Sequence, residues 1–187
     1  FYGKEITDTG KQKINDFVFY DIDSNEITNE TLKGKTIITS ILIPSCPSHC
    51  PIISQQVNEF VYKKIIGREN FKDFVLLSQL IDTTGKNPNL ESFINEQNVD
   101  SDRWLIVTGK ENNIYNFELP NANLLQNNNA DRATGGRTYY KMLILIDKNQ
   151  YVRGIYQGDK TLEIERLNKE MRVLEREYNK EAKKTKK

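Results

Sequence analysis

The sequence is poor in cysteine, histidine and proline, with 2, 1 and 5 residues of each among its 187. Two cysteines cannot build the multi-disulfide framework of a small secreted scaffold. The only histidine, His49, lies beside Cys50, so no Ser-His-Asp triad can be assembled elsewhere. Two neighbouring cysteines instead indicate a single redox or metal site.

The sequence also lacks an excess of charge and a long apolar run. Lys and Arg number 27 against 26 Asp and Glu, which leaves a formal charge of +1 and no reason to expect a nucleic-acid partner. The longest apolar run, Ile37–Pro44, is the size of a strand and far below the ~20 residues that span a bilayer. Because the chain begins at Phe1, we expect that a signal peptide or membrane tether preceded it.

What is present predicts an α/β fold with a mixed sheet. The β-branched run 36–43, between Gly34 and Pro44, is typical of a central strand buried on both faces. Pro51 opens a helical pattern, and apolar residues at helical spacing from Ile164 to Tyr178 predict a C-terminal amphipathic helix. The other expected elements are strands at 16–21, 74–80 and 104–107, helices at 88–96 and 111–117, a polar loop at 120–137 and a hairpin of 142–147 with 151–156.

The cysteines lie between the central strand and the first helix, in Cys46-Pro47-Ser48-His49-Cys50-Pro51. A helix start favours thiolate over thiol, and a cationic His49 would act in the same direction. One helical turn apart, the two α-carbons would be about 6 Å apart, which suits either a disulfide or a soft ion such as Cu(I). The alternative, a pair of inert buried thiols, fits this setting less well.

Four segments resemble the SCO/SenC family of thioredoxin-fold proteins between Asp16 and Asp159. They are Leu32–Lys35 (LKGK), Pro44–Pro51 (PSCPSHCP), Leu80-Ile81-Asp82 with Pro88, and Arg103–Gly109 (RWLIVTG). The resemblance implies a thioredoxin-like fold, a central mixed sheet flanked by helices, with an N-terminal strand or hairpin and a long C-terminal helix. It divides the chain into an N-terminal segment (1–15), the SCO/SenC domain (16–180) and a frayed basic tail (181–187).

The chain departs from the family pattern where the family binds copper. The histidine that supplies the third copper ligand falls at or near Tyr139, and Lys86 replaces an acidic residue, although Asp82 is retained. Two thiolates suffice for Cu(I), whereas a Cys2His site for Cu(II) would need His49 as a substitute ligand. No proline follows Pro120, so the cis-proline of thioredoxin-type oxidoreductases is missing too.

The resemblance implies a protein of the periplasmic or extracytoplasmic face, membrane-anchored, that acts in cytochrome c oxidase assembly. Our first hypothesis is thiol–disulfide exchange on a partner protein, with Cys46 as nucleophile and Cys50 as resolving thiol. The second is Cu(I) binding and delivery by the same two cysteines, with His49 as a further ligand. The third is a non-catalytic module that uses the fold for protein contact.

Overall fold

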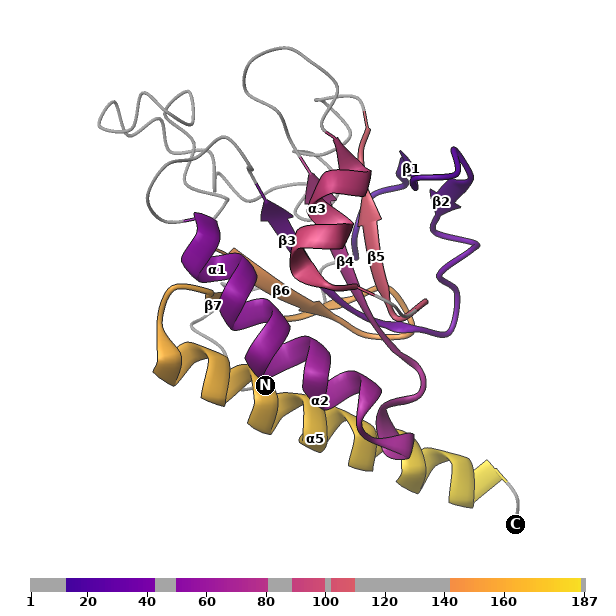
Figure 1. Ribbon diagram of the computed structural model, residues 1–187. Coiled ribbons are helices and arrows are strands. Elements are labelled where there is room, and N and C mark those ends of the chain that lie inside the picture. Colours follow the sequence, from indigo (N-terminus) through magenta and orange to yellow (C-terminus); the bar gives the residue numbers. More distant parts are fainter. Residues whose placement is uncertain (1–12, 43–49, 81–88, 100–101, 110–141, 186–187) are drawn as a thin grey trace.

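The computed structural model describes residues 13–42, 50–80, 89–99, 102–109 and 142–185 (Figure 1). Its centre is a sheet of five strands in the order β5-β4-β3-β6-β7. The strands are β3 (Thr36–Leu42), β4 (Phe74–Leu80), β5 (Trp104–Val107), β6 (Met142–Ile146) and β7 (Val152–Gln157).

The strand directions bring several chain ends to one edge of the sheet. β3, β4 and β5 are parallel, whereas β6 is antiparallel to β3 and β7 is antiparallel to β6. The carboxyl ends of the three parallel strands therefore meet at the edge where β6 begins. Every residue of β3 and β4 is buried, as expected for strands covered on both faces.

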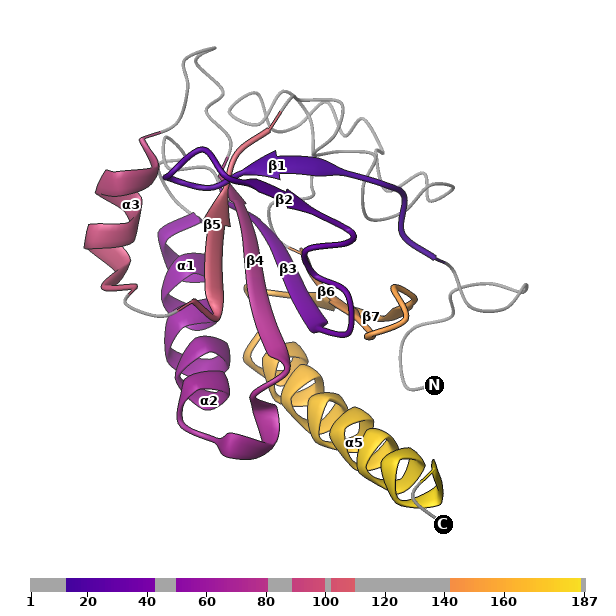
Figure 2. The ribbon, with the colours of Figure 1, turned by 90° about the vertical axis from the view of Figure 1, so that its right-hand side faces the viewer.

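The helices lie mainly on one side of this sheet (Figures 1 and 2). α1 (Cys50–Val57), the π-helical segment η1 (Asn58–Tyr62) and α2 (Lys63–Ile66) form one continuous helix, which lies beside the long α5 (Thr161–Thr185). A short 3-10 turn, η2 (Glu69–Phe71), precedes β4. α3 (Leu90–Gln97) lies between β4 and β5 in the sequence and stands next to β5. The small hairpin of β1 (Val18–Tyr20) and β2 (Glu26–Thr28) lies on the other side (Figure 2).

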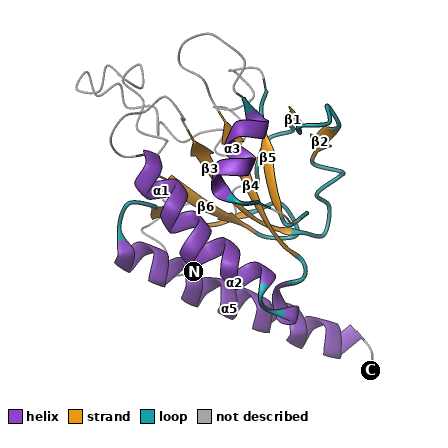
Figure 3. Cartoon of the chain, viewed as in Figure 1, coloured by secondary structure: helices purple, strands orange, loops and turns teal. Residues whose placement is uncertain are grey.

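The predicted fold class, α/β and thioredoxin-like with a mixed sheet, is confirmed (Figure 3). The strands at 74–80 and 104–107 have the predicted bounds, and the early strand is one arm of a hairpin. Several expected bounds were wrong by a residue or two: the helix expected at 88–96 is Leu90–Gln97, and the hairpin strands expected at 142–147 and 151–156 are Met142–Ile146 and Val152–Gln157. Two further details also differ. The first helix begins at Cys50 rather than Pro51, and α5 continues through Lys184 to Thr185 where we expected a frayed tail. The helix expected at 111–117 and the loop at 120–137 lie outside the described residues.

A buried polar line crosses the helix-covered face of the sheet. The Trp104 indole N–H donates to Ser78 Oγ at 2.9 Å, and Ser78 Oγ lies 2.8 Å from Ser40 Oγ. The Trp104 ring packs on Tyr62 of η1, with ring centroids 4.9 Å apart. Because the polar atoms of Trp104, Ser78 and Ser40 satisfy one another, these three side chains link three neighbouring strands inside the core.

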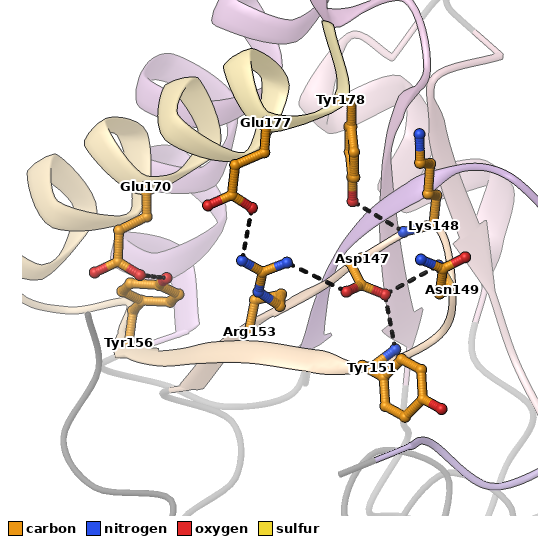
Figure 4. Close-up of polar contacts among 9 residues, drawn as sticks. All are labelled: Asp147, Lys148, Asn149, Tyr151, Arg153, Tyr156, Glu170, Glu177 and Tyr178. Atoms are coloured by element: carbon orange, nitrogen blue, oxygen red, sulfur yellow. Dashed lines mark hydrogen bonds and ion pairs between the residues drawn. The ribbon is translucent and has the colours of Figure 1, made fainter. Parts of the chain in front are cut away.

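α5 is anchored to the β6–β7 hairpin by a chain of charged groups (Figure 4). The buried Asp147 carboxylate accepts hydrogen bonds from the backbone N–H groups of Asn149 and Tyr151 at 2.9 and 3.0 Å. Its second oxygen lies 3.4 Å from the Arg153 guanidinium, which also donates to Glu177 of α5 at 2.9 Å. One buried carboxylate thus closes the turn and orients the arginine toward the helix.

The second anchor is the hydroxyl of Tyr156, which donates to Glu170 of α5 at 2.5 Å (Figure 4). Burial, followed by the hydrogen bond to Glu170, raises the pKa of Tyr156 far above its ordinary value. Gly154 lies under this side chain, since a Cβ there would come within 2.2 Å of the Tyr156 hydroxyl oxygen. The glycine therefore leaves the space that lets the tyrosine reach α5.

Replacing Asp147 by alanine is expected to lower the free energy of unfolding by about 3 kcal/mol, because the change leaves buried donors and Arg153 without their acceptor. Asp73→Ala is the matched control, since the Asp73 carboxylate pairs with Lys35 at 3.5 Å but is 62% exposed. Its cost should stay below about 0.5 kcal/mol. Urea unfolding of both variants measures the difference, and equal losses would contradict the anchoring role of Asp147.

Candidate functional site

The candidate site lies at the sheet edge where the three parallel strands end. β3 ends at Leu42 in the middle of the sheet, and α1 begins at Cys50. Residues 43–49, which join the two elements and include Cys46 and His49, lie outside the described residues. Of the predicted site residues the structure places only Cys50, as the first residue of a helix that directly follows the central strand.

The helix that starts at Cys50 is held by hydrogen bonds with two other helices, one accepted from α5 and one donated to α3. In the π-helical segment, the Phe60 carbonyl accepts a hydrogen bond from the Asn168 side chain of α5 at 3.0 Å. The Asn58 side chain donates to the carbonyl of Gln97, at the end of α3, at 2.7 Å. A π-turn displaces backbone carbonyls from the regular ladder, and here the buried Asn168 amide provides a partner for one of them.

The far end of the same helix is capped by β5. The guanidinium of Arg103, just before β5, donates to the carbonyls of Ile65 and Ile66 at 3.0 and 3.1 Å. The final carbonyls of a helix have no intrahelical donor, so a cation there satisfies them and complements the helix dipole. Because the middle and the carboxyl end of the helix are fixed, the direction of its axis is fixed too. The position of its first residue, Cys50, follows from that direction.

The start of α1 favours negative charge. Backbone N–H groups of a first helical turn point toward the residues that precede it, and the first turn of α1 contains no acidic residue that would offset them. A cysteine thiolate at such a position is stabilised relative to the thiol. The start of α1 is therefore a position that favours a negatively charged group.

The Arg103–Gly109 motif has a structural role in this site that its sequence did not reveal. Trp104 joins the buried polar line, and Thr108, just after β5, exchanges backbone hydrogen bonds of 2.8 and 2.9 Å with Tyr20 of the hairpin. Gly109 lies against Phe19, because a Cβ there would come within 2.7 Å of the ring. The motif thus attaches the long helix to the start of β5, through Arg103, and the β1–β2 hairpin to its end, through Thr108 and Gly109.

The copper expectation is not tested by these residues. Within 13–42, 50–80, 89–99, 102–109 and 142–185, no three His, Cys, Asp or Glu side chains are grouped as a metal site. Three residues were compared with the family pattern in the sequence, and all lie outside those ranges: Tyr139, Asp82 and Lys86. None of the described helices combines the length and the apolar character needed to cross a bilayer.

No protein-family model and no curated protein sequence match this chain. Solved structures do. An SCO1/SenC family lipoprotein from Bacillus anthracis has a TM-score of 0.66 at 20% identity, over 87% of this chain and 94% of that one. BsSco, a member of the Sco family of cytochrome c oxidase assembly proteins with a disulfide switch, also has a TM-score of 0.66. Its sequence identity is 19%, over 92% of this chain and 98% of that one.

Copper-bound and thiol-active proteins share the fold as well. Arabidopsis thaliana ScoI with copper bound has a TM-score of 0.60 at 15% identity, over 89% of this chain and 100% of that one. A thioredoxin-family thiol:disulfide interchange protein from Chlorobium tepidum has a TM-score of 0.59 at 16% identity, over 90% of this chain and 99% of that one. The resemblance to SCO/SenC proteins is therefore confirmed in the fold, which this chain shares along most of its length.

The thiol of Cys50 is expected to have a pKa well below the free-cysteine value of ~8.5, because it begins α1. The Cys46→Ser variant leaves Cys50 as the single thiol, and its rate of alkylation by iodoacetamide against pH gives the pKa. The control carries Cys46→Ser, Cys50→Ser and Gln55→Cys, which introduces a thiol at an exposed position beyond the first turn. Equal pKa values for the two thiols would show that the helix start has no such effect.

Proposed function

We propose that this chain is an SCO/SenC-type protein that exchanges disulfides with a partner protein through Cys46 and Cys50. The observation that carries the proposal is the position of Cys50, at the start of a fixed helix that directly follows the central strand of a thioredoxin-like sheet. The disulfide switch of BsSco, a protein of the same fold, supports it. Cys46 precedes Cys50 by about one helical turn of sequence, a spacing that suits a reversible disulfide between them.

The exchange we propose has two steps. The Cys46 thiolate attacks one sulfur of the partner's disulfide, which forms a mixed disulfide and releases the partner's other sulfur as a thiolate. Cys50 then attacks Cys46, so that the intramolecular disulfide forms and the partner's first sulfur leaves. The partner gains two electrons and two protons and becomes a dithiol, and the reverse sequence oxidises a partner dithiol. The helix start stabilises the Cys50 thiolate for its attack.

A second candidate function is the binding and delivery of Cu(I) as cargo by the same cysteines. Copper-bound Sco proteins from Arabidopsis thaliana and Bradyrhizobium japonicum share the fold. Two thiolates are a sufficient ligand set for Cu(I), and His49 is the only imidazole in the chain that could add to it. We also propose an extracytoplasmic, membrane-anchored location, which the lipoprotein among the structural neighbours supports.

Disulfide exchange is tested with a short peptide that contains one disulfide, followed by mass spectrometry after alkylation. The reduced wild-type protein should yield one intramolecular disulfide for each peptide reduced. Cys50→Ser should accumulate the mixed disulfide on Cys46, whereas Cys46→Ser should react at least ~10-fold more slowly, because the attacking thiol is lost. A wild-type protein that leaves the peptide oxidised would contradict the proposal.

Copper delivery makes a separate prediction for the reduced protein. A Cu(I) titration against a competing chelator should give one ion per chain, and Cys46→Ser or Cys50→Ser should abolish it because one thiolate cannot replace two. His49→Ala tests the third ligand: an unchanged affinity makes the site a two-thiolate one, and a loss makes His49 a ligand. Exchange activity without Cu(I) binding would eliminate the copper role and retain the redox one.

A further inference from the structure

The charges of α5 are sorted onto different faces of the helix. Three glutamates recur every seven residues, and each contacts a partner near the β6–β7 hairpin. Glu163 pairs with Arg166, whose guanidinium also donates to the carbonyl of Ile155 in β7 at 2.9 Å. Glu170 accepts from Tyr156, and Glu177 pairs with Arg153. The acidic flank of α5 is therefore engaged with the sheet.

The opposite, solvent-facing side of α5 carries cations. They follow the three-four spacing of a single helix face, and all are exposed: Lys169, Arg172, Arg176, Lys180 and Lys183. Within the part of the chain that the structure describes, none of these five forms an ion pair within 4.0 Å. Glu165 is the one acidic residue on the same face. We call this row the basic row of α5.

The basic row continues onto the neighbouring helix. The Asn168 side chain is hydrogen-bonded to the Phe60 carbonyl, which holds α5 beside η1 and α2 (Figures 1 and 2). Burial, and then the nearby positive charges of Arg172 and Arg68, lower the pKa of Lys64. Cations of both helices thus lie near one another, with the Glu165 carboxylate as an opposing charge beside Lys64. Such an arrangement weakens the fold slightly and is more useful as a binding surface.

Large apolar side chains are exposed among these cations. Phe60 is 47% exposed, and Val173 of α5, between Arg172 and the next turn, is 39% exposed. Leu162, at the start of α5, is 77% exposed. A surface that mixes lysine and arginine with protruding apolar side chains matches the headgroup region of a bilayer, where anionic phosphates and acyl chains lie at neighbouring depths.

We propose that the face formed by the basic row of α5 with Phe60, Lys64 and Arg68 docks onto the anionic surface of a phospholipid bilayer. The basic row runs from Lys169 to Lys183, about 21 Å along the helix, which suits an extended plane better than a single acidic site. A nucleic acid would bind the cations but would gain little from Phe60 and Val173. The proposal does not depend on Cys46 or Cys50.

The test is flotation of the whole chain with vesicles of phosphatidylcholine, with and without phosphatidylglycerol. We expect binding to the anionic vesicles that weakens as salt is raised, and at least ~10-fold weaker binding to the neutral ones. Each cation at a membrane surface contributes about 1 kcal/mol, so the double variant Arg172→Gln, Arg176→Gln should bind about thirtyfold more weakly. Failure of the wild-type protein to bind anionic vesicles at low salt would overturn the proposal.

The matched control removes two positive charges outside the proposed face, with Lys13→Gln and Lys33→Gln, both at exposed positions. It should bind within about threefold of the wild type, and an equal loss would show that only net charge matters and would also overturn the proposal. Phe60→Ser should weaken vesicle binding several-fold at all salt concentrations, since the apolar contact is not screened. Retention on heparin without vesicle binding would identify a polyanion site instead.

Discussion

The burial of β3 between two layers is the constraint on which the rest of this molecule depends. All its residues from Thr36 to Leu42 are inaccessible to solvent, and it pairs with β4 on one side and β6 on the other. A strand enclosed in this way cannot slip by one residue without moving its apolar side chains to the wrong face. Its carboxyl end is therefore fixed, and with it the point from which the chain reaches α1.

The long helix from Cys50 to Ile66 packs its apolar side chains into the core and is also held by polar contacts at its middle and its carboxyl end. Asn168, Asn58 and Arg103 each donate to backbone carbonyls, and they belong to three different parts of the chain. Side-chain amides and guanidinium groups give direction to a helix that apolar packing alone would leave able to slide. Polar contacts also hold α5, where Glu170 and Glu177 contact Tyr156 and Arg153 of β7, while the cations of the basic row face the solvent.

Much of the fold could be predicted because its strands have strong local signals. The run at 74–80 is apolar except for Ser78 and Gln79, the WLIV segment at 104–107 is apolar throughout, and the structure has both at those bounds. The N-terminal element was expected as a strand or a hairpin and is a hairpin, but the bounds of its second strand were not predicted because Glu26-Ile27-Thr28 is too short for a pattern. The π-turn at 58–62 was missed because it depends on Asn168, more than a hundred residues away in the chain. Sequence spacing carries no record of such a partner.

The site was predicted less completely than the fold. The position of Cys50 at a helix start follows from the apolar run before it and the helical spacing after it. The structural part of Arg103 and Gly109 could not be predicted, since it requires the contacts of α2 and of Phe19 in three dimensions. The Arg103–Gly109 segment, one of the four that carried the family resemblance, is therefore partly a support for the long helix. Its residues affect the site by fixing the position of that helix.

The central claim is that two sulfur atoms work as a pair at the junction of β3 and α1. Equilibration of the protein with glutathione buffers of graded redox potential tests it most directly, with the fraction of each thiol state read by mass after quenching. The account predicts a single two-electron transition between the Cys46, Cys50 dithiol and an intramolecular disulfide. Two independent one-thiol glutathionylation steps, or cysteines that stay reduced throughout, would contradict it.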